Sequence, residues 1–155
     1  MTMTIADRLA ELAIALPTPA APVAAYVPAV EAAGLLHVSG QLPFADGALM
    51  TGRLGEDRDL AYGTQAARAC GLMLLAQARS ALGSLDRVAR VVKLGAFVCS
   101  APGFTDQPKV ANGASELMVE IFGDNGRHAR SAVGVPVLPL GAVVEIDAIF
   151  AIGPA

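Results

Sequence analysis

One arginine and two carboxylates interrupt otherwise apolar sequence near the C-terminus. Arg130 opens a β-branched run to residue 135, and Glu145 and Asp147 lie inside a second run over residues 143–152. Residues two apart in an extended strand point to the same face, so the two carboxylates should share one face while the other is apolar. Burying a charged side chain in a strand costs free energy unless the charge is paired, so such residues usually have a structural partner or a functional role. The sequence therefore predicts a strand with one face in the core and one face that does chemistry or forms an interface.

Two roles are open for these charges. Arg130 can form an interfacial salt bridge with Glu145 or Asp147, or its planar guanidinium can bind the carboxylate of a ligand through two parallel hydrogen bonds. The small residues Ala132 and Gly134 alternate with Arg130 along the strand and leave space for such a ligand. Glu145 can pair with a cation, or it can accept a proton from water if partial burial raises its pKa. The residues alone leave both roles open.

These charges belong to four blocks that follow one another along the chain. The blocks are Pro22 to Tyr26, Val38-Ser39-Gly40-Gln41-Leu42-Pro43, Asn112, and Arg130-Ser131 followed by Leu138-Pro139 and Val144-Glu145-Ile146-Asp147-Ala148. Together they resemble the signature of the Rid proteins, the reactive intermediate deaminases that are also called the YjgF-type family. Four blocks in order are more specific than any single motif.

The resemblance implies roles at four positions. It implies that Arg130 binds the substrate carboxylate and that Glu145 places a water for attack on an imine carbon. Many relatives carry a cysteine at the position of Ala132, where the family uses mainly the backbone carbonyl to orient the water. Alanine keeps that carbonyl and removes the thiol. Asp147 matches a position that is expected to support the scaffold.

Four further residues are expected to line the same pocket. Tyr26 would border it through its ring or hydroxyl, Ser39 and Gly40 through hydroxyl and backbone groups, and Asn112 from a helix. Each has a plain structural alternative, such as packing for the tyrosine and loop support for the asparagine. Phe97 is expected in the core.

The spacing of apolar residues predicts an α+β fold. Two helices can cover only one face of the predicted mixed sheet, and the other face is too apolar to be left to water. The resemblance implies a chorismate-mutase-like fold, assembled as a trimer around a central β-barrel with sites in clefts between subunits. The expected helices are residues 60–82 and 109–122, and the expected strands are residues 23–30, 35–38, 88–98, 130–135 and 143–152.

The chain is expected to have two parts. Residues 1–22 would form an amphipathic helix, from Thr4 to Leu16, and a proline-rich connector, and residues 23–155 would form the Rid-like α+β domain. Residues 12–30 carry no charge, but their four prolines argue against a membrane span. Charged residues among the first eleven also argue against a signal peptide. We therefore expect a soluble, cytoplasmic protein.

The composition bears on possible partners. Hydrophobic residues make up 54% of the chain and charged residues only 16%, which indicates that part of the apolar surface lies in subunit interfaces. The net charge is -3 and the basic residues are scattered, so nucleic acid is not an expected partner. His37 and His128 lack partners at metal-ligand spacing, and neither a metal nor a cofactor is expected.

The hypothesis that follows is a cofactor-free homotrimeric enzyme. It would hydrolyse reactive 2-imino or enamine acids to 2-keto acids and ammonia, as a hydrolase acting on C=N bonds. The alternative is a non-catalytic trimer that binds a small carboxylate or acts as a chaperone-like scaffold. The net negative charge of the chain argues against a ribonuclease, because RNA binding depends on clustered basic residues.

Overall fold

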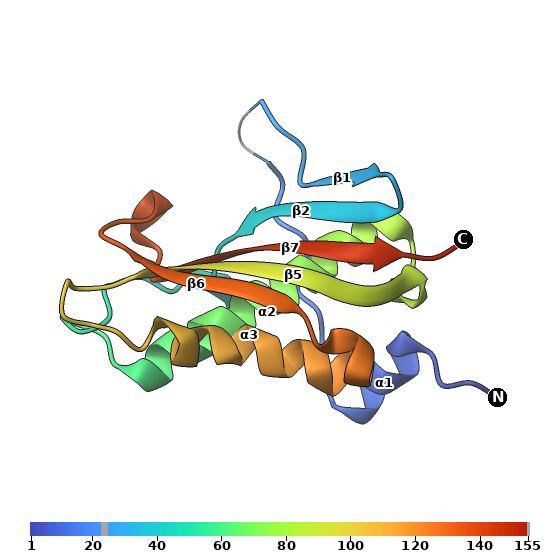
Figure 1. The fold of residues 1–155 in the computed structure, drawn as a ribbon, viewed down its shortest axis with the longest axis horizontal. Helices are drawn as coiled ribbons and strands as arrows, with labels where there is room; N and C mark the ends of the chain where they lie inside the picture. The colour runs from blue at the N-terminus through green and yellow to red at the C-terminus, as the bar shows by residue number, and fades with distance from the viewer. Residues whose placement is uncertain (23–24, 155) are drawn as a thin grey trace.

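A mixed β-sheet with helices on one face forms the body of the protein. The computed structural model describes residues 1–22 and 25–154. Its helices and strands are α1 (Ile5–Glu11), β1 (Ala29–Ala32), β2 (Leu35–Gln41), β3 (Phe44–Ala45), β4 (Ala48–Leu49), α2 (Leu60–Leu82), β5 (Val88–Cys99), α3 (Gln107–Phe122), β6 (Ala129–Val135) and β7 (Val144–Ile152). Five strands lie in the order β1-β2-β7-β5-β6, with α2 and α3 packed together beneath them (Figure 1). The predicted α+β fold is confirmed.

Helix α2 begins and ends where the sequence predicts. The Asp59 side chain accepts a hydrogen bond from the backbone N–H of Tyr62 at 2.9 Å, which caps the first turn. Gly83 ends the helix with a φ of 81°, a conformation that costs glycine little. Both signals are local, so the sequence alone was sufficient to predict them.

Helix α3 crosses α2 at very short range. A Cβ atom at Gly113 would collide with the backbone carbonyl of Thr64, so only glycine permits this approach. The helix connects β5 to the parallel strand β6 and begins at Gln107, two residues before the predicted start. The crossing holds one side of α3 over the start of β6.

Pairing with β5 determines which face of the sheet each charged residue occupies. Leu94 pairs with Ala148 of β7 and with Arg130 of β6, whereas Phe97 pairs with Glu145. Directly paired residues point to the same face of a sheet. Leu94 and Ala148 are buried under the helices. Arg130 therefore lies on the helix-covered face, and Glu145 lies on the open face.

The opening hairpin contains an irregularity. Val38 of β2 pairs with Ala148, and Gln41 pairs with Ile146, so three steps along β2 correspond to two along β7. The extra residue makes a β-bulge at Ser39 and Gly40. A bulge bends the strand and changes the direction of the side chains beside it. The predicted hairpin is confirmed, but β1 begins at Ala29 rather than at residue 23. Pro28 has no backbone N–H to donate to a neighbouring strand. Residues 23 and 24 lie outside the described residues.

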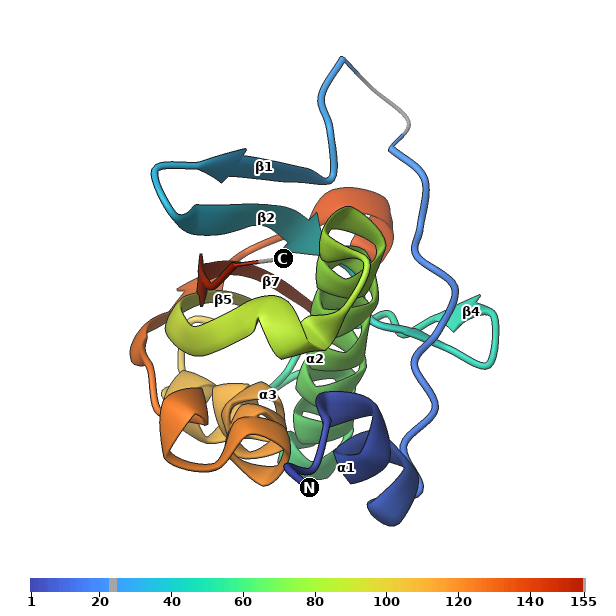
Figure 2. The ribbon, with the colours of Figure 1, turned by 90° about the vertical axis from the view of Figure 1, so that its right-hand side faces the viewer.

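The predicted N-terminal helix is present but shorter than expected. It ends at Glu11 instead of Leu16, because Ala13 takes a left-handed φ of 55°. Arg8 Nε donates to the carbonyl of Glu120 at 2.9 Å, which ties α1 to α3. The chain then runs along α2 toward β1 (Figure 2), where Gln77 Nε2 donates to the carbonyl of Ala20 at 2.7 Å. None of the described helices is both long and apolar enough to span a bilayer.

Candidate functional site

Arg130 is braced against α3 by three acceptors. Its Nη1 donates to Asn112 Oδ1 at 2.8 Å and to Ser115 Oγ at 3.0 Å. Its Nη2 donates to the backbone carbonyl of Pro108 at 3.2 Å. Residues three and four apart share one side of a helix, so α3 presents all three acceptors together. A guanidinium carries five N–H donors, and these bonds use three of them, which leaves two for a ligand.

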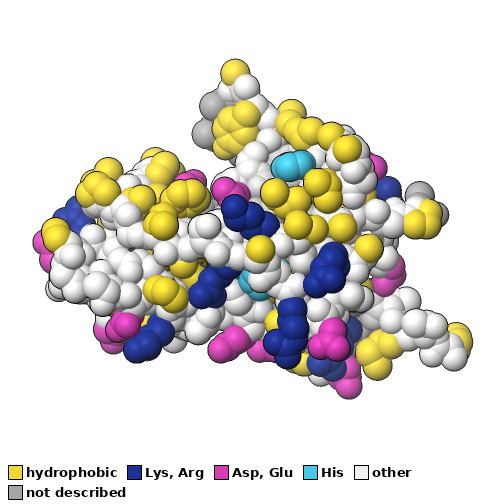
Figure 3. All heavy atoms as spheres, viewed as in Figure 1, with side chains coloured by type: hydrophobic (Ala, Val, Ile, Leu, Met, Phe, Trp, Pro, Cys, Tyr) yellow, Lys and Arg dark blue, Asp and Glu magenta, His cyan; other side chains and the backbone are white. Residues whose placement is uncertain are grey.

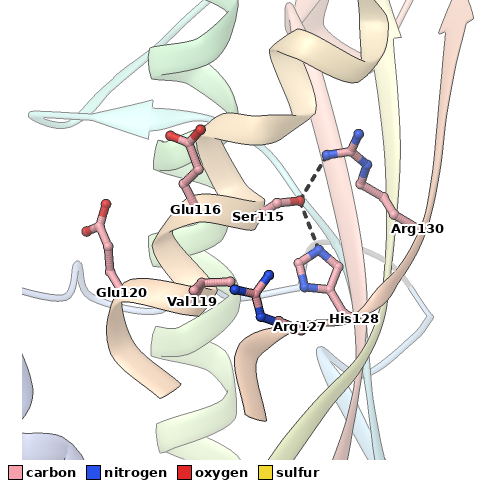
Figure 4. A pocket seen from close by; sticks show the side chains of 7 residues that line it. All are labelled: Ser115, Glu116, Val119, Glu120, Arg127, His128 and Arg130. Atoms are coloured by element: carbon pink, nitrogen blue, oxygen red, sulfur yellow. Dashed lines mark hydrogen bonds between the residues drawn. The ribbon is translucent and has the colours of Figure 1, made fainter. Parts of the chain in front are cut away.

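The Ser115 hydroxyl lies between Arg130 and His128 (Figure 4). Its Nε2 lies 2.9 Å from Ser115 Oγ, and its Nδ1 lies 2.6 Å from the carbonyl oxygen of Gly126. Burial lowers the pKa of His128, and the nearby Arg130 charge lowers it further, although the Gly126 carbonyl opposes both effects. The ring is therefore neutral at physiological pH. We call Arg130, Asn112, Ser115, His128 and the Pro108 carbonyl the arginine cluster.

Sequence reasoning found Arg130 and Asn112 but missed Ser115 and His128. Both were accessible through spacing, since Ser115 follows Asn112 by three residues on a helix and His128 precedes Arg130 by two in an extended segment. Ser115, His128 and Arg130 border an open pocket of about 820 Å³ beside α3 (Figure 4), and Asn112 contacts Arg130 from the same helix. The helix side of that pocket also carries Glu116, so it is bordered by both signs of charge.

The backbone of Ala132 faces the free edge of the sheet. The carbonyl of Val135 accepts a hydrogen bond from the N–H of Ser100 at 3.0 Å, and so it points toward the β5 side. Carbonyl directions alternate along a strand, so the carbonyl of Ala132 points away from β5. Strand β6 is the last strand of the described sheet. The Ala132 carbonyl is thus available beside the arginine cluster.

Glu145 lies against the bulge of β2. Its Cδ is 3.0 Å and its Oε1 3.1 Å from the point where a Cβ of Gly40 would be. Burial raises the pKa of Glu145, and the neighbouring Asp147 charge raises it further. A carboxylate with a raised pKa is suited to accept a proton near neutral pH.

Asp147 and Phe97 occupy the same open face. Burial raises the pKa of Asp147, while the Gly95 backbone N–H and Lys93 oppose that effect. Its Oδ1 also fills the place that a side chain on Gly95 would take. Phe97 was predicted in the core, but it is only half-buried and lies opposite Glu145 on the open face. The prediction was wrong because β5 is apolar on both faces, so its pattern does not reveal which face is covered.

Tyr26 and Gly40 line one pocket, and Ser39 precedes Gly40 in the bulge of β2. Ser39 Oγ donates to the carbonyl of Val27 at 2.9 Å, which ties β2 to the segment that carries Tyr26. Tyr26 is 51% exposed and lines a pocket of about 180 Å³ together with Gly40. We call Glu145, Gly40, Ser39 and Tyr26 the glutamate cluster.

The two clusters are separated within one chain. Strand β5 lies between β6 and β7, so the strands that carry Arg130 and Glu145 are about 10 Å apart, and the two side chains lie on opposite faces. The structure therefore brings the predicted residues together as two groups rather than one. A small ligand that contacts Arg130 cannot also contact Glu145 of the same chain.

Metal ligands are not assembled in either cluster. Across residues 1–22 and 25–154, no three or more His, Cys, Asp or Glu side chains gather in a way that could hold an ion.

Comparison with known proteins identifies the family. Residues 6–151 match the family model described as "YjgF/chorismate_mutase-like, putative endoribonuclease". The chain belongs to the YjgF/chorismate-mutase-like family. The match begins inside α1, and it includes Arg130, Glu145 and the β2 bulge.

Three relatives cover nearly the whole of this YjgF-family chain. Protein TCP17 of Trypanosoma cruzi is 54% identical over 147 residues, which are 94% of this chain and 92% of the relative. Atu1372 of Agrobacterium tumefaciens, a protein described as of unknown function, is 47% identical with a TM-score of 0.89, and the match covers 96% of this chain and 92% of that one. A Shewanella oneidensis protein described as a "putative endoribonuclease" is 33% identical with a TM-score of 0.92, over 96% and 99% of the two chains.

Proposed function

We propose that this YjgF-family protein hydrolyses reactive 2-imino or enamine acids to 2-keto acids and ammonia, in clefts between subunits of a homotrimer. The observation that carries the proposal is Arg130, whose guanidinium is braced by three acceptors and keeps two N–H donors. Adjacent N–H groups of an arginine match the two oxygens of a carboxylate. A braced side chain also loses little conformational entropy when it binds, which favours a ligand clamp over a loose surface pair.

Glu145 would act as the base in this reaction. A water oxygen bonds to the carbon of the protonated imine, Glu145 takes one of the water's protons, and the C=N electron pair moves to the nitrogen, which becomes a neutral amine. The adduct then carries a hydroxyl and an amine on one carbon. When the hydroxyl proton leaves and the nitrogen is protonated, the C–N bond breaks, the C=O bond forms, and ammonia departs. The raised pKa of Glu145 supports both taking and returning the proton.

Water would be held by a second acceptor, the carbonyl of Ala132. This carbonyl faces the free edge of β6 and can accept the hydrogen that Glu145 does not take. Because the imine is already electrophilic, orientation supplies much of the rate. Atoms and electrons balance with water alone, so this step requires no cofactor.

A second copy of the chain would complete each site. The arginine and glutamate clusters lie on opposite faces and two strands apart, so one ligand can reach both only across two subunits. The open face also carries apolar side chains such as Ile149 and Phe97, whose burial would stabilise an assembly. We expect a trimer, in which each cleft takes the arginine cluster of one subunit and the glutamate cluster of the next.

Two variants test the reaction. Arg130→Ala should lose both pyruvate binding and turnover, because the ligand carboxylate loses its charge-assisted partner. Glu145→Gln should still bind pyruvate but release ammonia from fresh 2-iminopropionate on the order of a hundredfold more slowly. Calorimetry and an ammonia assay measure the two effects. Arg79→Ala is the matched control, since that exposed arginine lies in the last turn of α2 beside α1 rather than in either cluster.

The binding-only alternative has a clear signature. A protein that binds pyruvate through Arg130 but releases no ammonia above the uncatalysed rate would be a carboxylate-binding module. Wild-type turnover by intact Glu145→Gln would instead make Glu145 structural.

Ribonuclease activity, suggested by the description of the family model, has less support on this chain. Lysine and arginine side chains on the face in Figure 3 are interspersed with acidic ones and form no continuous stripe. Protein–RNA affinity depends on neutralising several phosphates together. We expect only weak binding of single-stranded RNA at physiological salt. Sub-micromolar affinity with a steep salt dependence would favour the ribonuclease.

A further inference from the structure

Three contacts, through the side chains of Ser115 and His128, connect Arg130 to the backbone of the turn that precedes β6. Arg130 Nη1 donates to Ser115 Oγ at 3.0 Å, and Ser115 Oγ lies 2.9 Å from His128 Nε2 (Figure 4). His128 Nδ1 lies 2.6 Å from the Gly126 carbonyl oxygen. The proposed reaction uses Arg130 but assigns nothing to Ser115 or His128. Their distances make a continuous chain of hydrogen bonds.

For a neutral His128, only one arrangement of protons satisfies this chain. The Gly126 carbonyl can only accept, so Nδ1 of His128 must carry the proton that lies between them. Neutral His128 then has a lone pair on Nε2, which accepts the hydroxyl proton of Ser115. The Ser115 hydroxyl thus points its proton toward His128 and its lone pairs toward the guanidinium.

The histidine decides whether Ser115 can act as an acceptor for Arg130. Without an acceptor at Nε2, the serine proton is free to rotate toward Nη1, where it would oppose the guanidinium. Gly126 in turn lies so close to α3 that a Cβ there would collide with the Met118 carbonyl. The turn therefore holds its carbonyl, and through it the His128 ring, at a defined distance from Ser115.

We propose that Ser115 and His128 are positioning residues that orient the guanidinium of Arg130 for carboxylate binding. The inference rests on the proposed function of Arg130. It adds that the orientation of the guanidinium is set through a serine and a neutral histidine. We call the hydrogen-bond chain from Arg130 through Ser115 and His128 to Gly126 the relay. It affects the binding of the carboxylate and not the attack of water at the imine carbon.

The relay can be tested without a ligand. Nitrogen NMR at pH 7.5 should find a protonated Nδ1 and an unprotonated Nε2 on His128, together with resolved Nη protons of Arg130 at low temperature. In Ser115→Ala and His128→Leu the Arg130 signals should average, because the guanidinium then rotates more freely. Val119→Ala is the matched control, since Val119 borders the same pocket one turn further along α3. A proton on Nε2, or Arg130 signals unchanged in both variants, would overturn the proposal.

Binding and steady-state kinetics distinguish a positioning role from a general loss of folded structure. Ser115→Ala and His128→Leu should raise the Kd for pyruvate and the KM for 2-iminopropionate by on the order of five- to tenfold, with kcat within about twofold. The conservative variants Ser115→Thr and His128→Gln keep the hydroxyl and the acceptor and should recover near wild-type values. A fall in kcat alone, or no recovery in variants with wild-type melting temperatures, would contradict the relay.

Failure of the proposed function gives a different result. If the wild type neither binds pyruvate nor releases ammonia, the carboxylate site is refuted. The NMR signals then still decide whether Ser115 and His128 orient Arg130.

Discussion

Gly40 shows how a residue without a side chain can determine the position of a charged one. Its backbone has no left-handed φ, so alanine would cause no backbone strain there, but an added Cβ would lie 3.0 Å from Glu145 Cδ. The flexible carboxylate would have to move by a few tenths of an ångström. The bulge in β2 therefore matters to the proposed base through the space it leaves.

We predict that Gly40→Ala lowers ammonia release at least tenfold while the melting temperature changes little. Misplacement of a base by a fraction of an ångström weakens proton transfer, whereas moving a flexible side chain costs little stability. Gly103→Ala is the matched control, because no atom lies within 4 Å of its added Cβ. Full activity of Gly40→Ala would show that the carboxylate does not need its present position.

Glu145 also carries a consequence for stability. Burial and Asp147 raise the pKa of Glu145 in the folded chain. A group whose folded pKa is raised stabilises the fold fully below its unfolded pKa and loses that contribution as the pH rises through the folded pKa. At neutral pH the charged form is therefore a cost to the folded protein.

We predict that Glu145→Gln increases the free energy of unfolding at pH 7.5, by less than about 1 kcal/mol because the side chain is partly exposed to screening solvent. The gain should vanish near pH 3.5, where the wild-type carboxyl is protonated in both states. Urea denaturation at equal protomer concentration measures it, with the exposed Glu116→Gln as control. A loss of stability at pH 7.5 would mean that Glu145 has a stabilising partner in the assembly.

At the scale of elements, the turn between α3 and β6 combines packing with placement of the site. Gly126 is buried, and a Cβ there would collide with the Met118 carbonyl of α3. We predict that Gly126→Ala lowers the free energy of unfolding by about 1–3 kcal/mol, as overpacking does, and weakens pyruvate binding. Asn125→Ala, in the exposed part of the same turn, should do neither. Denaturation and calorimetry on the two variants make the comparison.

The elements differed in how far the sequence predicted them. Helix α2 was predicted residue for residue, because Asp59 and Gly83 terminate it through contacts within one turn. The predicted end of α1 at Leu16 was wrong, because the left-handed backbone of Ala13 has no marker in its side chain. The bulge at Ser39 and Gly40 was also missed, since it depends on the register between β2 and a strand a hundred residues later.

The candidate site follows the same division. Motif resemblance identified Arg130, Asn112, Glu145 and Gly40, and the structure brings each into one of two clusters. That Arg130 and Glu145 point to opposite faces could not be predicted, because it depends on the pairing of β5 with both neighbours. Ser115 was missed although its spacing of three residues from Asn112 on a helix indicates the same side of α3.

At the scale of the whole molecule, the split between clusters makes a quantitative prediction. Arg130→Ala and Glu145→Gln should each be inactive alone, but trimers reassembled from an equal mixture should regain about a quarter of wild-type activity, because a site is intact when each cluster comes from the unaltered side. Light scattering should give a mass near three times 15.7 kDa for all forms. No recovery in properly mixed trimers would refute sites shared between subunits.

The placement of Arg130 and Glu145 on opposite faces of one sheet also has a genetic consequence. In a cell that expresses equal amounts of a normal and a doubly substituted allele, a shared site survives only when both contributing chains are normal, about a quarter of the time. An allele altered at Arg130 alone would leave about half of the sites intact. The double allele would therefore act as a dominant inhibitor of its normal counterpart, and the strength of that dominance would report the architecture of the site in vivo.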